Sequence, residues 1–123
     1  MKRIALATSL TLALTSLLPV PAQAANPQVT FETVDSYSLG YGLGPDQSTY
    51  GIELTGIVQG ENTPRTIVTN MSPAYSDSEF IGRSCERMAL LAQSKPGQYL
   101  LQVRYEATAP HYLLGCSLTR VTP

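Results

Sequence analysis

Residues 75–97 have the pattern of an amphipathic helix, whereas the chain beyond residue 24 otherwise shows only strand patterns. At about 100° per residue, the apolar and small side chains of this segment fall on one broad face and most charged ones on the other. The apolar face comprises Phe80, Ile81, Ser84, Cys85, Met88, Ala89, Leu91 and Ala92. Because such a face has to be covered, the fold must offer this helix a surface to lie on.

Both ends of this helix carry signals in the sequence. Ser76 is placed to cap the first turn, and Glu79 is placed to reach back to it, as in a capping box. Tyr75 and Phe80 stand where a hydrophobic staple would close over that cap. The Pro96-Gly97 pair cannot continue a helix, so we expect the helix to end before it.

The chain has two cysteines, Cys85 and Cys116. Cys85 lies on the apolar face of the helix. Cys116 lies in the last strand pattern, where alternation places it on one face with three apolar residues, namely Tyr112, Leu114 and Leu118. Two independent periodicities therefore point both cysteines into the same contact, and we predict a Cys85–Cys116 disulfide.

Five segments have strand patterns, and the helix falls between the third and the fourth. They are residues 29–39, 50–58, 65–70, 99–106 and 112–121. The fourth is the clearest, because apolar and polar residues alternate along almost its whole length. We predict a mostly β, α+β fold of five antiparallel strands in the order β-β-β-α-β-β. An OB-like barrel plugged by the helix and an open sheet with the helix across one face both fit this order.

The first 24 residues have the features of an export signal. A basic start at Lys2 and Arg3 precedes an apolar run, and Ala22-Gln23-Ala24 has the form of a signal-peptidase site. We therefore expect a cleaved signal peptide over residues 1–24 and one small β-rich domain over residues 25–123. This predicts a bacterial protein in the periplasm or secreted, without a membrane span in its mature chain.

Charge argues against one class of partner. Without Lys2 and Arg3, six of the eight basic residues remain against nine acidic ones, so the net charge becomes −3. Nucleic acid is bound mainly through lysine and arginine contacts to phosphate, so we expect no nucleic-acid partner.

No constellation of residues predicts catalysis, a metal site or a cofactor. His111 is the single histidine, so no histidine cluster can form, and no G-x-S-x-G nucleophile motif is present. The glycine-rich residues 40–44 suggest a phosphate loop, but such a loop needs a following helix, and here a strand pattern follows. We expect a non-enzymatic protein without cofactor or metal.

Tyrosine is the residue best suited to binding in this chain. Tyr41 stands in the glycine-rich loop, with Tyr37 and Leu43 nearby, and an aromatic ring on a loop gives a large contact area at low entropic cost. These three are the candidate binding residues, and the alternative is that Tyr41 folds back onto the sheet. Leu90, on the charged face of the helix, is placed for a helix-to-helix contact in a homo-oligomer, although a single exposed leucine is also ordinary.

The leader, the element order, the domain size and the disulfide together resemble the pentameric B subunits of bacterial AB5 toxins. The helix segment Ser84-Cys85-Glu86-Arg87-Met88-Ala89 is similar in character to theirs. The chain departs from that family in its disulfide position and in having no tryptophan, so no family binding residue is carried over. The resemblance implies a module that binds a glycan or a protein. An inhibitor or immunity-type protein with one protein partner is the alternative, and a small hydrolase ranks third.

Overall fold

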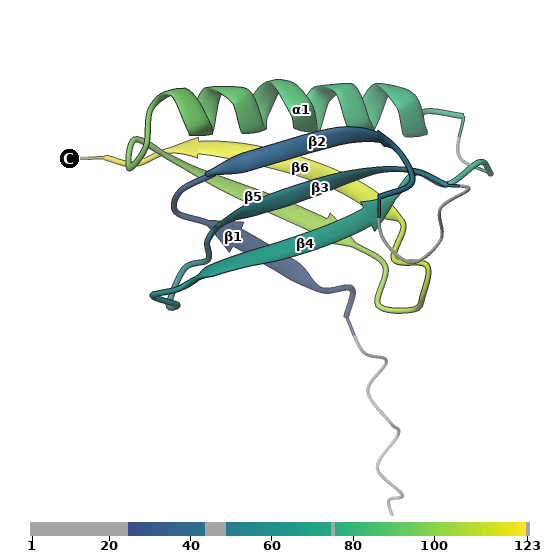
Figure 1. The fold of residues 1–123 in the computed structure, drawn as a ribbon, viewed down its shortest axis with the longest axis horizontal. Helices are drawn as coiled ribbons and strands as arrows, with labels where there is room; N and C mark the ends of the chain where they lie inside the picture. The colour runs from purple at the N-terminus through teal and green to yellow at the C-terminus, as the bar shows by residue number, and fades with distance from the viewer. Residues whose placement is uncertain (1–24, 44–48, 75, 123) are drawn as a thin grey trace, which may run out of the picture.

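A computed structural model describes residues 25–43, 49–74 and 76–122. Within them, six strands and one helix follow in the order β-β-β-β-α-β-β (Figure 1). The elements are β1 (Gln28–Phe31), β2 (Ser36–Tyr41), β3 (Tyr50–Ile57), β4 (Pro64–Asn70), α1 (Ser78–Ser94), β5 (Tyr99–Tyr105) and β6 (Leu113–Arg120). The expected signal peptide lies outside the described residues.

The strands form two antiparallel three-stranded sheets, in the orders β1-β5-β6 and β2-β3-β4. The fold is therefore mostly β with one helix, as predicted, but it has six strands in two sheets instead of five, and the closed barrel, one of the two predicted architectures, is wrong. The difference arises in residues 29–39, where one predicted strand is two. Phe31 pairs with Leu101 of β5, whereas Ser36 already pairs with Thr55 of β3.

The chain changes sheets at a corner between β1 and β2. There the amide of Glu32 donates to the carbonyl of Ile57 at 2.7 Å, and the amide of Asp35 donates to that of Thr55 at 2.8 Å. Gly56 makes this approach feasible, because a Cβ at this position would collide with the carbonyl oxygen of Thr33. The corner leaves strand geometry while its backbone amides still find partners.

The two sheets also meet at a second place. Asn70, the last residue of β4, forms a single parallel bridge with Tyr112, just before β6. The Asn70 side chain strengthens this junction, since its Nδ2 donates to the carbonyl of Pro110 at 2.7 Å. β4 and the loop before β6 are thus held together, although no ladder continues between the sheets.

One hydrophobic core lies between the sheets and under the helix. The largest side chains in it that are almost wholly buried come from β1, β3, β5 and β6, namely Phe31, Ile52, Leu54, Leu101, Val103 and Leu113. The alternation predicted for β5 is confirmed, because Leu101 and Val103 have no exposed surface. α1 lies along one side of the sheets, next to β6 and β2 (Figure 1).

The helix starts later than the sequence predicts, and the capping box is wrong. Asp77 is the N-cap residue, α1 begins at Ser78, and no side chain caps the first turn. Glu79 instead accepts a hydrogen bond from Arg83 at 2.7 Å. The staple partner Tyr75 lies outside the described residues.

The helix also buries a narrower face than its pattern indicates. Its fully buried residues are all small, namely Gly82, Cys85, Ala89 and Ala92. Phe80 was expected on this face but is 74% exposed, and Leu91 is 36% exposed. Phe80 lies about 140° around the axis from Cys85, so the strand that contacts Cys85 cannot also cover it.

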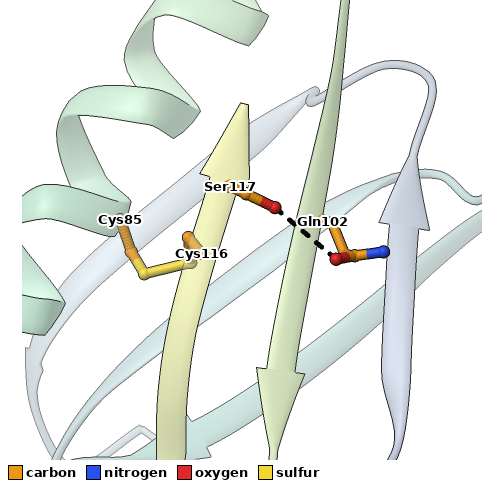
Figure 2. The surroundings of a disulfide bond; sticks show 4 residues. All are labelled: Cys85, Gln102, Cys116 and Ser117. Atoms are coloured by element: carbon orange, nitrogen blue, oxygen red, sulfur yellow. Dashed lines mark hydrogen bonds between the residues drawn. A yellow bond between two sulfur atoms is a disulfide. The ribbon is translucent and has the colours of Figure 1, made fainter. Parts of the chain in front are cut away.

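The predicted disulfide is confirmed. Cys85 of α1 is bonded to Cys116 of β6, with their Cα atoms 5.3 Å apart (Figure 2). The face predicted for β6 needs one correction. Arg104 pairs with Gly115 but Tyr105 pairs with Leu113, so Leu114 is an extra residue in a bulge. Leu113 therefore replaces Tyr112 and Leu114 on the inner face.

Candidate functional site

A groove of about 610 Å³ opens where four parts of the chain end or begin. It lies beside the start of α1, the end of β4, the adjoining ends of β2 and β3, and the loop before β6. The lining residues among those described are Tyr41, Thr49, Tyr50, Met71, Ser72, Pro73, Ser78, Glu79 and Tyr112. The volume is within the usual range for a small-molecule site, about 300–1,000 Å³.

Two tyrosines form one wall of this groove. Tyr41 ends β2 and pairs in register with Tyr50, which begins β3. Their ring centroids are 5.0 Å apart and the planes are inclined by 63°, an edge-to-face arrangement. Tyr50 packs against the core, whereas Tyr41 is 75% exposed. The ring of Tyr50 is therefore held by the core, and the ring of Tyr41 lies against it with most of its surface exposed.

Met71 and Ser72, both buried, lie under the groove. The end of the Met71 side chain contacts the position of Gly82, where a Cβ would collide with it. The amide of Met71 donates to the carbonyl of Tyr50 at 2.7 Å, and Ser72 Oγ accepts from the amide of Ala74 at 3.2 Å. These contacts hold the segment between β4 and α1 in place, so the base of the groove is preformed.

Ser78 and Glu79 line the groove from the first turn of α1. The side chain of Glu79 is 70% exposed, and it pairs with Arg83 at 2.7 Å. An exposed pair of this kind is worth about 0.3–0.5 kcal/mol, so it does not lock the carboxylate away from a ligand. Among the lining side chains that the structure describes, Glu79 is charged and the others are neutral.

The three candidate residues from the sequence have different positions. Tyr41 lines the groove, and its ring rests on Tyr50 while most of its surface is exposed. Tyr37 is half-buried against the core, and neither it nor Leu43 belongs to the described lining. Gly44, the last residue of the glycine-rich loop, lies outside the described residues.

Tyr50, Tyr112 and Glu79 were missed as site residues. Their local patterns assigned the two tyrosines to strands and Glu79 to the helix cap. One signal was present, because Tyr41 and Tyr50 flank the loop and would face each other if its two strands formed a hairpin. The approach of Tyr112 depends on the Asn70–Tyr112 bridge, which joins positions far apart in the chain.

Other features of the described residues indicate no further chemistry. His111 is exposed, and its Nδ1 lies 3.0 Å from the carbonyl oxygen of Glu106. Residues 25–43, 49–74 and 76–122 contain no group of three His, Cys, Asp or Glu side chains suited to a metal ion. In the same part of the chain, α1 is neither long nor apolar enough to cross a membrane.

The chemistry of the groove is suited to binding a ligand. It combines aromatic faces, hydroxyl groups and one carboxylate, which suits a ligand with both apolar and polar parts. Comparison with known protein families, curated proteins and solved structures finds no match.

Proposed function

We propose that this protein is an exported, non-enzymatic binding module, and that the groove beside Tyr41 is its binding site for a glycan or protein partner. The observation that carries the proposal is the exposure of Tyr41. A ring that is 75% exposed contributes little to its own fold, yet it stands at the mouth of a groove with a preformed base. Burying such a ring against a partner contributes about 1–3 kcal/mol.

The placement of the loops supports the same site. Binding residues are common at loops, because a rigid scaffold positions them. The ends of two connections reach this groove, since Tyr41 and Tyr50 flank the β2–β3 connection and Tyr112 ends the loop before β6. The proposal includes a binding role similar to that of the B subunits of AB5 toxins.

The test compares Tyr41→Ala with Phe80→Ala. Phe80 is a matched control, because it is 74% exposed and lies outside the described groove lining. A glycan array and a pull-down from periplasm identify the partner, and its affinity is then measured for both variants. We expect Tyr41→Ala to weaken binding roughly tenfold or more, while loss of its contact with Tyr50 lowers the free energy of unfolding by about 1 kcal/mol at most.

An equal effect of both substitutions on affinity, or none from Tyr41→Ala, would place the binding site elsewhere. Capture of one protein partner without any glycan signal would favour the inhibitor or immunity-type function.

Export and assembly belong to the same proposal. The Cys85–Cys116 bond fits an oxidising compartment such as the periplasm or the extracellular medium. N-terminal sequencing of protein from these fractions should begin near residue 25, and an intact Met1 would contradict export by cleavage. Leu90, exposed on α1, is suited to a homo-oligomer contact, which native mass spectrometry can detect.

A further inference from the structure

The groove joins aromatic rings from strands that are distant in sequence. Tyr41 and Tyr50 make a corner, because their planes are inclined by 63° at a centroid distance of 5.0 Å. Tyr112 reaches the same groove from the loop before β6. Each ring has a negative face, and the ring of Tyr41, which is largely exposed, can offer its face to a small ligand group in the groove.

The charges of the described lining favour a cation over an anion. Glu79 is its one charged side chain and contributes −1, and the start of α1 adds about +0.5 of an elementary charge, so a simple sum leaves roughly −0.5. Asp77 and Arg83 lie outside this lining and carry opposite charges. The described lining itself contains no lysine, arginine or histidine that would repel a cation.

From this combination we propose that the groove binds an alkylated ammonium group, such as the trimethylammonium end of choline. The methyl groups contact the exposed ring of Tyr41 beside Tyr50, and the carboxylate of Glu79 balances the charge. Quaternary ammonium groups are recognised by aromatic residues in this way because they carry charge but offer no hydrogen-bond donor. The group fills only a small part of about 610 Å³, and the rest of the groove takes the remainder of the ligand. This proposal rests on the proposed function, since it uses the same groove, and it extends the ligands proposed there to compounds that carry such an ammonium group.

The test is an NMR titration of the purified protein with choline chloride. Sodium chloride controls for ionic strength, and 3,3-dimethyl-1-butanol serves as an uncharged analogue of the same shape. We expect choline to shift the amide signals of Tyr50, Ser72 and Glu79 but not those of Thr33 and Gln59, which line a separate pocket. The uncharged analogue should bind at least ~5-fold more weakly, because it lacks the attraction of a cation to the rings.

Two variants with matched controls test the assigned residues. Tyr41→Leu should weaken choline binding ~5-fold or more, and Phe80→Leu should not. Glu79→Gln should weaken it ~3-fold, while Glu61→Gln should leave it unchanged. Glu61 is matched to Glu79, because it also forms an exposed i,i+4 pair, with Arg65 at 3.1 Å. Equal binding of the uncharged analogue, equal effects of site and control variants, or no binding of choline would each overturn the proposal.

A second assay identifies the source of the ammonium group. Vesicles of phosphatidylcholine are compared with vesicles of phosphatidylglycerol in a sedimentation assay. Selective binding to phosphatidylcholine assigns the group to a lipid headgroup, whereas binding of free choline alone assigns it to a soluble compound. If choline fails but a partner from the array or pull-down still loses affinity in Tyr41→Ala, the ammonium proposal falls and the binding function stands.

Discussion

Removal of the Cys85–Cys116 bond should cost more stability than the loss of any other contact of α1. The residues that α1 buries fully are small, and a buried alanine methyl contributes only about 0.8 kcal/mol. Ile81 and Met88 are larger but only partly buried. The disulfide therefore provides much of what holds the helix on β6, and Cys85→Ala/Cys116→Ala is the perturbation that measures it.

The magnitude follows from the loop that the bond closes. The two cysteines are 31 residues apart in sequence. In the chain-entropy model, closing a loop of this length raises the free energy of the unfolded chain by about 4 kcal/mol at 25 °C. For a domain of about 100 residues, a loss of this size lowers the melting temperature by roughly 15–30 °C.

Urea unfolding followed by circular dichroism gives the free energy of unfolding of the wild type and the double variant. Wild-type protein reduced with dithiothreitol should match the double variant, because reduction removes the same constraint. Ser117→Ala, an exposed neighbour on β6, is the control and should change stability by less than about 0.5 kcal/mol. A loss below about 1 kcal/mol in the double variant would refute the reasoning, since the bond would then constrain little.

Three further predictions test the fold, two of them with a control substitution. Gly56→Ala should lower the free energy of unfolding by about 1–3 kcal/mol, because the added methyl group meets a backbone carbonyl. Gly40→Ala is the control and should cost less than about 1 kcal/mol, because the space around Gly40 is open. Equal losses in urea titrations would contradict this prediction. Leu101→Ala should cost about 2–5 kcal/mol and Phe80→Ala less than about 1 kcal/mol, and a large loss from the latter would mean that its ring is covered. Ser76→Ala should leave the melting temperature and the free energy of unfolding nearly unchanged, since no side chain caps α1. A decrease of about 1 kcal/mol in the free energy of unfolding would mean that Ser76 does cap the helix.

Local patterns in the sequence identified the helix, most of the strands and one long-range contact. Alternation identified β5 with its inner face, and helical periodicity identified α1 and the inward direction of Cys85. The disulfide could be predicted because both patterns pointed a cysteine inward in a chain with only two. Each of these features depends on neighbours one to four positions apart, so the sequence alone contains the information.

Tertiary structure decided the corner between β1 and β2, the bulge at Leu114 and the exposure of Phe80. Periodicity states which side chains share a face, but it does not state how much of that face a neighbouring element covers. The groove is a stronger example, because Tyr41, Glu79 and Tyr112 come from three elements that meet only in the folded chain. Their approach depends on where β4 ends against the loop before β6, and that contact is set by how two sheets share one core, not by any local preference of the residues involved.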